Sequence, residues 1–570
     1  MPKLAVREFG AVEASEGETL LEALRRAGVP VAAACGGLGL CGLCRVRVLQ
    51  GDLSEPTPRE VELLGQQLKN GWRLACQARA LGNASVEVPL RRFLAKFRVR
   101  PTARITSPAL FVPFDASEGE PSYEELLLET LRKAGVEARS ASLSALNVLS
   151  SRPSGVAVVV EGEVIDVTDS YSGYGLAVDV GTTSVAASLI DLVSGALVAE
   201  AATLNAQLKF GADIVSRIRH AIAEPDGVRQ LREAVIGTVN ELLSKLGAPP
   251  GRVYRVTVAG NSVMLHLFFG VNPRPLGYLP FRPVYRRSLT ARGRELGLNV
   301  HPHALVESLP ILGGYVGGDV VGDLLTAKLW EYGTAMLIDV GTNGEIVIKK
   351  GGEYVAASTP AGPAFEGVGL HSGMMAIDGA IERVRLRGGG EPEYSVIGGG
   401  EARGICGSGY IDLLAELLRA GLLSRDGRLA RGPRVRELNG ALAYVIDEER
   451  GIALTQQDVR KLQLAIGAVK LAAKFLMRKV GVSAEDLERV VVAGDFGYHL
   501  DARNAMEVGL LPKVDESSVE YIGNGSLTGA ELYMVSQDCR RLALELATEC
   551  KVLDVPRDTH SFIAELKLGW

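Results

Sequence analysis

The stretch LAVDVGTTSV at residues 176–185 returns later in the chain as LIDVGTNGEI at residues 337–346. In each copy an apolar run reaches an aspartate, Asp179 or Asp339, and a glycine- and threonine-containing turn leads into a second apolar run. The two aspartates are 160 positions apart (339 − 179). One such motif would be weak evidence, but the pair predicts two similar β-hairpins within one large C-terminal domain.

The turns of both hairpins carry the residue types of a phosphate clamp. Glycine lets the backbone approach phosphate oxygens, while turn N–H groups and hydroxyls donate to them. Asp179 and Asp339 would hold Mg²⁺ through water. Two hairpins that face each other would grip a β,γ-phosphate from both sides. The candidate phosphate ligands are Gly181, Thr182, Thr183, Gly341, Thr342, Asn343 and Gly344.

Three further stretches follow in the order that a nucleotide site needs. An apolar strand runs into Gly494 and Asp495, a turn suited to adenine and ribose. The residues Gly407, Ser408 and Gly409 open an amphipathic helix whose N-terminus could receive an anion. Asp319 begins another helix, 20 positions before Asp339 (339 − 319). Each glycine turn alone is most often a plain hairpin or cap, but their joint order favours a nucleotide site.

Two common nucleotide motifs are missing from the sequence. No GxxxxGK[ST] stretch occurs, so a P-loop is excluded. Residues 404–409 are no clean Rossmann fingerprint, because no matching strand precedes them.

Four of the seven cysteines lie within the first 76 residues. Cys35, Cys41 and Cys44 follow a C-x5-C-x2-C spacing, and Cys76 comes 31 residues later (76 − 44 − 1). The plant-type [2Fe-2S] pattern is C-x4-C-x2-C with a distant fourth cysteine, so only the first interval differs, by one residue. Glycines between the cysteines let the backbone aim N–H groups at the sulfurs. A zinc site is the alternative, but this glycine loop fits zinc poorly. We therefore expect all four cysteines to ligate a [2Fe-2S] cluster.

Length and composition limit the remaining possibilities. The 570 residues exceed one core and carry a net charge of −5, which argues against a dedicated nucleic-acid binder. No apolar run approaches the ~18–20 residues that span a bilayer, and the N-terminus resembles no signal peptide, so we expect a cytoplasmic protein. We expect a cluster domain at 1–90, a basic linker at 91–105, a small α/β middle domain at 106–172 and the nucleotide domain at 173–570.

Both ends of the chain resemble known families. The cysteine region resembles the [2Fe-2S] ferredoxins, and its spacing is similar to the adrenodoxin-type branch. The twin hairpins resemble the actin/sugar-kinase/heat-shock-chaperone superfamily of ATPases. These resemblances imply a multidomain α+β and α/β fold: a β-grasp ferredoxin-like domain, a small middle domain and a two-lobed, RNase-H-like ATPase domain. In the chaperone members an acidic residue before the second hairpin orients water or metal, a place that Asp319 takes here, with Asp323 as the alternative.

The combination of these two parts resembles the reductive activators of corrinoid-dependent proteins, over residues 5–88 and 175–565. The family-like stretches include NAQLKFGADIVSR at 205–217, AGNSVMLH at 259–266, PAGPAFEG at 360–367 and GNGSLTGA at 523–530. The resemblance implies a [2Fe-2S] cluster, ATP and Mg²⁺ as cofactors. It also implies that an external low-potential donor supplies an electron, which passes through the cluster to the Co(II) corrinoid of a partner methyltransferase or corrinoid iron–sulfur protein. A homodimer is expected from the resemblance alone.

Two other functions stay open at this point. One is a small-molecule kinase of the same superfamily with a regulatory iron–sulfur domain, and the other is a redox-sensing regulator without turnover. A kinase would usually add a substrate base and a sugar-binding insert, and the sequence shows neither. Spacing alone assigns no role to Glu366 or Asp213.

Overall fold

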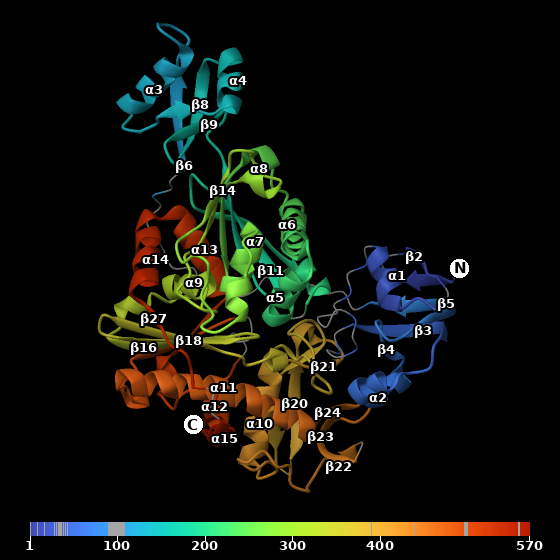
Figure 1. The fold of residues 1–570 in the computed structure, drawn as a ribbon. Helices are drawn as coiled ribbons and strands as arrows, with labels where there is room; N and C mark the ends of the chain where they lie inside the picture. Colours follow the sequence, from blue (N-terminus) through green and yellow to red (C-terminus); the bar gives the residue numbers. More distant parts are fainter. Residues whose placement is uncertain are drawn as a thin grey trace.

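The structure is a computed structural model (Figure 1). It describes residues 2–7, 10–15, 17–27, 29, 31, 37, 39, 42, 44–88, 106, 109–211, 213–388, 390–438, 440–494, 500–556 and 559–570. Within these residues no helix combines the length and the apolar character that a bilayer crossing requires.

The N-terminal part is a β-grasp fold, as the ferredoxin resemblance implied. Its mixed sheet has the order β2-β1-β5-β3-β4, with β1 and β5 parallel. Capping boxes from Thr19 to Glu22 and from Thr57 to Glu60 begin its two helices. The elements are β1 (Lys3–Val6), β2 (Gly10–Glu13), α1 (Leu20–Arg26), β3 (Arg45–Leu53), α2 (Pro58–Leu64), β4 (Trp72–Leu74) and β5 (Ala80–Glu87).

A small α/β unit follows, and it stands at the end of the molecule remote from the C-terminus (Figure 1). Four strands in the order β6-β8-β9-β7 carry two helices, whose leucines pack on the sheet around Leu127 and Leu149. The elements are β6 (Ala109–Asp115), α3 (Tyr123–Lys133), β7 (Ser140–Ala141), α4 (Leu143–Ser151), β8 (Ser154–Val160) and β9 (Glu163–Thr168).

The first lobe of the C-terminal part contains the first predicted hairpin. Strands β10 and β11 form that hairpin, β12 extends it, and β13 pairs with β10 in parallel. Helices α6 and α7 cover the sheet. The elements are β10 (Tyr174–Val180), β11 (Ser184–Asp191), β12 (Leu197–Leu204), α5 (Ile214–Ala223), α6 (Gly227–Lys245), β13 (Val253–Gly260), α7 (Ser262–Phe269), β14 (Thr290–Arg292), α8 (Gly293–Leu296) and β15 (Leu305–Ser308).

The second lobe repeats this arrangement around the second hairpin. Strands β16, β17 and β18 form the same antiparallel meander, and β25 pairs with β16 in parallel as β13 does with β10. The sequence repeat is thus a structural repeat. The elements are β16 (Thr334–Val340), β17 (Gly344–Lys350), β18 (Glu353–Thr359), α11 (Gln456–Val480), β25 (Arg489–Ala493), α12 (Ala502–Val508), β26 (Val519–Gly523), α14 (Gln537–Glu549), β27 (Lys551–Val552) and α15 (Thr559–Ala564).

Two helices lie between the sheets of the two lobes. Helices α9 (Gly318–Ala327) and α13 (Gly525–Val535) pack on each other, and both contact β13 of the first lobe. Gly322 and Gly529 allow this, because a Cβ on Gly529 would lie 2.2 Å from Gly322 Cα. Both lobes therefore share one core through this helix pair.

A smaller unit is inserted in the second lobe between β18 and α11. It has two three-stranded sheets beside one helix, and the iron–sulfur domain lies against it (Figure 1). Asn70 Nδ2 donates to Glu449 O across this contact at 3.4 Å. The elements are β19 (Ala380–Arg387), β20 (Glu391–Val396), β21 (Gly404–Ile405), α10 (Gly407–Arg419), β22 (Val435–Leu438), β23 (Ala441–Asp447) and β24 (Ile452–Thr455).

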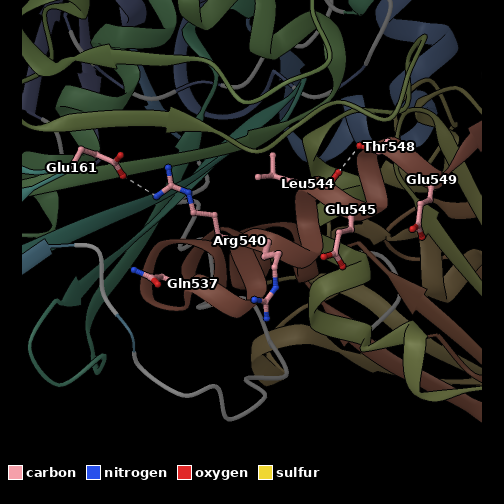
Figure 2. A pocket seen from close by; sticks show the side chains of 8 residues that line it. Glu161, Gln537, Arg540, Leu544, Glu545, Thr548 and Glu549 are labelled. Carbon is pink, nitrogen blue, oxygen red and sulfur yellow. Dashed lines mark hydrogen bonds and ion pairs between the residues drawn. The ribbon is translucent and has the colours of Figure 1, made fainter.

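A buried group of charges ties α14 to the first lobe. Glu307 is fully buried and accepts hydrogen bonds from Arg255, also buried, and from Arg540 on α14. Arg540 also donates to Glu161 at 3.2 Å, at the edge of a shallow pocket of about 570 Å³ beside the middle unit (Figure 2). Two arginines thus depend on one carboxylate.

The variant Glu307→Ala should strongly destabilise the C-terminal part. It leaves Arg255 buried without its counter-charge, and removing one partner of a buried pair costs about 3–5 kcal/mol. Thermal unfolding by calorimetry measures the loss. Glu353→Ala, which removes an exposed pair with Lys551, is the matched control and should cost less than about 1 kcal/mol. Equal effects of the two variants would contradict this account.

Candidate functional site

The two hairpin turns face each other across one carboxylate. Thr183 Oγ1 in the first turn donates to Glu366 Oε2 at 3.1 Å, and Thr342 Oγ1 in the second donates to Glu366 Oε1 at 2.6 Å. Glu366 ends the short helix η6 (Pro363–Glu366) after β18. The structure thus brings the predicted phosphate donors of both hairpins to one point.

Asp179 and Asp339 take equivalent places in the two sheets. Asp179 lies opposite Ala186 and Ala259, while Asp339 lies opposite Glu345 and Ala493. The carboxylate of Asp179 also accepts from two side chains at the start of α13, Asn524 Nδ2 and Ser526 Oγ, each at 2.9 Å. These bonds fix the Asp179 side chain within the region between the lobes.

Helix α9 adds the half-buried Asp319 and the buried Asp323 to the same region. Burial, followed by repulsion from Asp339 and Asp179, raises the pKa of Asp319 to about 8. Burial and the same neighbours also raise the pKa of Asp323 well above its usual range. Both candidates for the acidic residue before the second hairpin are therefore present one helical turn apart.

This carboxylate group fits a hydrated cation. Asp323 Oδ2 is buried and has no hydrogen-bond partner, and a cation would relieve both that deficit and the repulsion between the carboxylates. No three His, Cys, Asp or Glu side chains of the described ranges converge as direct metal ligands. A Mg²⁺ here would keep several water ligands, as it usually does beside phosphates. Asp179 and Asp339 would hold it through water, with Asp319 and Asp323 beside them.

Gly494 lies directly beside Asp339. Its φ is +89°, and an added Cβ would lie 2.7 Å from Asp339 Oδ1 and 2.8 Å from Val340 O. The turn after β25 can therefore carry only glycine without displacing the aspartate. Asp495, the other residue of this predicted adenine-ribose turn, lies outside the described residues.

The residues Gly407, Ser408 and Gly409 form the buried start of α10. Ser408 Oγ donates to Glu382 O at 3.1 Å, and an added Cβ on Gly409 would lie 2.4 Å from Ile381 O. Close packing of α10 on β19 thus explains Gly409. A role of the three residues in nucleotide binding stays a prediction.

Several polar residues support the first hairpin and have no assigned role in the motif. Asn205 Nδ2 donates to Gly181 O at 2.9 Å, and the buried Arg217 donates to Thr182 O. Asn261 Nδ2 donates to Thr182 Oγ1 at 3.4 Å. In the sequence, only their position in the family-like stretches 205–217 and 259–266 marked these residues as candidates. Spacing alone could not predict that they contact the first hairpin.

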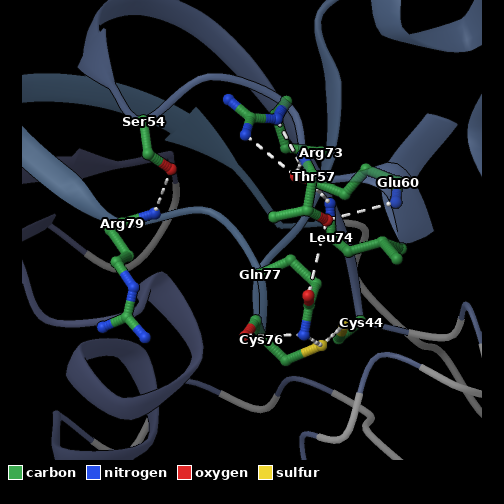
Figure 3. A network of polar contacts seen from close by, with 9 residues as sticks. All are labelled: Cys44, Ser54, Thr57, Glu60, Arg73, Leu74, Cys76, Gln77 and Arg79. Atoms are coloured by element: carbon green, nitrogen blue, oxygen red, sulfur yellow. Dashed lines mark hydrogen bonds and ion pairs between the residues drawn. The ribbon is translucent and has the colours of Figure 1, made fainter.

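Cys44 and Cys76 lie together in the iron–sulfur domain (Figure 3). Their Sγ atoms are 3.2 Å apart, and both residues are buried. Gly37, Gly39 and Gly42 of the cysteine loop have φ values of +100°, +73° and +68°, a conformation that favours glycine. Two adjacent thiols beside such a loop fit the thiolate ligands of a [2Fe-2S] cluster. Cys35 and Cys41 lie outside the described residues.

A buried carboxylate holds the strand that leads to Cys76 (Figure 3). Glu60 accepts from Arg73 Nε and Nη2 at 2.9 and 3.0 Å, and from Leu74 N at 3.0 Å. Gln77 Nε2 in turn donates to Cys76 Sγ at 3.7 Å. Such donors to sulfur stabilise the reduced form of a cluster.

The fold and the site define an iron–sulfur protein with an actin-like ATPase domain, and family comparisons agree. Residues 10–81 match the 2Fe-2S iron-sulfur cluster binding domain. Residues 174–332 match the RACo middle region, and residues 333–567 match the C-terminal domain of RACo, described as the ASKHA domain.

Individual relatives cover most of the chain. Corrinoid activation enzyme RamQ of Eubacterium limosum is 36% identical over 410 residues, which are 67% of this chain and 69% of that protein. A Co(II) methylated amine-specific corrinoid protein reductase of Methanosarcina barkeri is 29% identical over 66% of this chain and 72% of its own. A solved structure, the reductive activator for corrinoid,iron-sulfur protein, matches with a TM-score of 0.75 and 30% identity, over 99% of this chain and 97% of its own. The chain belongs to the RACo family of corrinoid reductive activators.

The variant Glu60→Ala should weaken cluster retention. It leaves Arg73 buried without its carboxylate and frees the backbone next to Cys76, at a cost of about 3 kcal/mol for a broken buried pair. Bleaching of the visible absorbance in mild denaturant measures retention. Glu62→Ala on the same helix removes an exposed carboxylate and should bleach at the wild-type rate. Similar bleaching of both variants would contradict this role of Glu60.

Mg²⁺ and nucleotide binding should release protons at pH 7. The raised pKa of Asp319, about 8, means that this carboxyl is largely protonated before the cation binds, whereas the cation favours the ionised form. Calorimetry in buffers of different ionisation enthalpy counts the protons. Asp319→Asn should reduce the release, and the exposed control Asp538→Asn should not. The apparent Mg²⁺ affinity should rise as pH approaches 8; an affinity independent of pH would contradict the shift.

Proposed function

We propose that this protein is an ATP-dependent reductive activator that passes an electron from its [2Fe-2S] cluster to the Co(II) corrinoid of a partner protein, restoring Co(I). The observation that carries the proposal is one chain that joins a thiol pair to two facing hairpin turns and matches a reductive activator along its length. The relatives named above are an activation enzyme, a reductase and a reductive activator of corrinoid proteins. Their names favour this function over a kinase or a redox sensor.

In this proposal the cleft binds nucleotide through both hairpins. The phosphate donors are Thr182, Thr183, Thr342 and the turn amides from Gly341 to Gly344. Asp179 and Asp339 hold hydrated Mg²⁺, and Asp319 orients water, with Asp323 as the alternative. Cys35, Cys41, Cys44 and Cys76 hold the cluster, which supplies one-electron transfer when it is bound.

Energetics favour a conformational role for ATP. Plant-type clusters have potentials near about −400 mV, and each ~59 mV of uphill one-electron transfer lowers the equilibrium tenfold. A nucleotide-closed form that prefers the partner in a more easily reduced state would offset this deficit, since a ligand shifts an equilibrium by its differential affinity. The lobes, which share α9 and α13, supply the elements that can close.

Four further features belong to the proposal. The electron comes from an external low-potential donor, the protein acts in the cytoplasm, and it forms a homodimer. The partner is a methyltransferase or a corrinoid iron–sulfur protein.

Two variants should separate the two activities. In an anaerobic mixture of reduced protein, Mg²⁺-ATP and a Co(II) corrinoid protein, the wild type should form the Co(I) absorption band. Cys76→Ser should lose the cluster spectrum and the Co(I) band yet bind ATP, because Cys76 belongs to the separate core of the iron–sulfur domain. Asp339→Ala should keep the cluster spectrum and lose ATP hydrolysis.

Matched controls are available in the same chain. Cys539→Ser and Asp538→Ala change a partly buried cysteine and an exposed aspartate on α14, and both should behave as wild type. No Co(I) band from the wild type with an authentic partner would refute the proposed function. Loss of both activities in either variant without unfolding would refute the division of labour.

A further inference from the structure

One segment, residues 362–375, reaches from the nucleotide cleft to the iron–sulfur domain; we name it the connecting segment. It begins at the second hairpin, where Gly362 N donates to Thr342 O at 2.9 Å. Four residues later, Glu366 accepts the hydroxyls of Thr183 and Thr342, one from each lobe. One carboxylate of this segment thus joins the phosphate-binding turns of both lobes.

The other end of the segment contacts the iron–sulfur domain through His371. The ring Nδ1 of His371 lies 3.3 Å from Glu62 O, and an added Cβ on Gly65 would lie 3.0 Å from its Cε1. Arg45 Nη2 donates to His371 O at 3.4 Å, while Arg45 Nε donates to Gly42 O in the cysteine loop at 2.9 Å. Arg45 therefore touches both the connecting segment and the loop that leads to the cluster.

Between these ends the segment is folded tightly on itself. An added Cβ on Gly367 would lie 2.3 Å from Met374 O, and one on Gly373 would lie 2.1 Å from Gly367 O. His371 N also donates to Asp458 Oδ1, in the first turn of α11, at 2.9 Å. Because its two sides are in backbone contact, a displacement at Glu366 moves the loop that contains His371.

The place of Glu366 conflicts with the proposed place of the nucleotide. The hydroxyls of Thr183 and Thr342 are the donors that a bound phosphate would use, and here a carboxylate accepts both. A carboxylate and a phosphate are both anions, so they repel each other and compete for the same donors. Glu366 has to move when the phosphate binds.

We propose that Glu366 senses the nucleotide: phosphate takes the two threonine hydroxyls from it, and the displaced connecting segment alters the contact between His371 and the iron–sulfur domain. The inference rests on the proposed nucleotide site and identifies the element through which that site acts. In this proposal Glu366 is a positioning residue, since it acts by joining Thr183 and Thr342 of the two hairpin turns.

The first test measures nucleotide affinity of the full-length, cluster-loaded protein with Mg²⁺ and a non-hydrolysable ATP analogue. Glu366→Ala should bind the analogue about tenfold more tightly, because a competing acceptor of two charge-assisted hydrogen bonds is gone. Glu393→Ala, which removes an exposed carboxylate paired with Arg387, should bind as the wild type does. Unchanged or weaker binding by Glu366→Ala would overturn the proposal and make Glu366 a ligand of the nucleotide, metal or water.

The second test measures hydrogen exchange of the iron–sulfur domain. In the wild type the analogue should change exchange at residues 58–70, which include the contact with His371. His371→Ala should still bind the analogue but show no such change, and in Glu366→Ala exchange should be the same with and without nucleotide. A change that persists in either variant, or is missing in the wild type, would overturn the proposal. A wild type that binds no analogue would also refute the proposed function, whereas normal wild-type binding without the variant effects refutes only this inference.

Discussion

The C-terminal part depends on a crowding of carboxylates between its lobes, of which Asp323 is buried and the others are half-buried. Asp179 and Asp339 end equivalent strands, and α9 adds Asp319 and Asp323 to the same place. Burial first, and repulsion between these carboxylates second, raise the pKa values of Asp319 and Asp323, which makes the group a poor stabiliser of the fold. The same repulsion makes it a strong receptor for a cation. The site is therefore arranged for its ligand at the expense of local stability, as functional sites commonly are.

Much of the surrounding structure accommodates this crowding. Asn524 and Ser526 give Asp179 two hydrogen bonds, and Gly494 leaves room for Asp339. Helices α9 and α13 pack closely on each other at Gly322 and Gly529, and the carboxylate group lies beside this helix pair. The core between the lobes and the carboxylate site thus share the helices α9 and α13. Movement of either lobe therefore changes the distances between the carboxylates.

The sequence was sufficient for the features that repeat or cluster locally. The hairpins at residues 176–185 and 337–346 follow from a short repeated motif, and the resemblance of the cysteine region to [2Fe-2S] ferredoxins implied the β-grasp fold. Glu366, Asn205 and Arg217 could not be assigned in this way. Each acts through a partner from another element, at separations of 183, 24 and 35 residues, and only tertiary packing sets those pairs.

The arrangement also limits how nucleotide chemistry can influence an electron. The phosphate donors belong to the two lobes, while Cys44 and Cys76 belong to a separate β-grasp unit with its own core. Among the described residues, side-chain hydrogen bonds between that unit and the rest are few, and they involve Arg45, Asn70 and His371. Because so few bonds join the two parts, a small difference in free energy between nucleotide states is enough to shift their contact. About 1.4 kcal/mol shifts a two-state equilibrium tenfold. So few side-chain hydrogen bonds leave the iron–sulfur domain able to change its position, whereas a large apolar interface would fix it permanently.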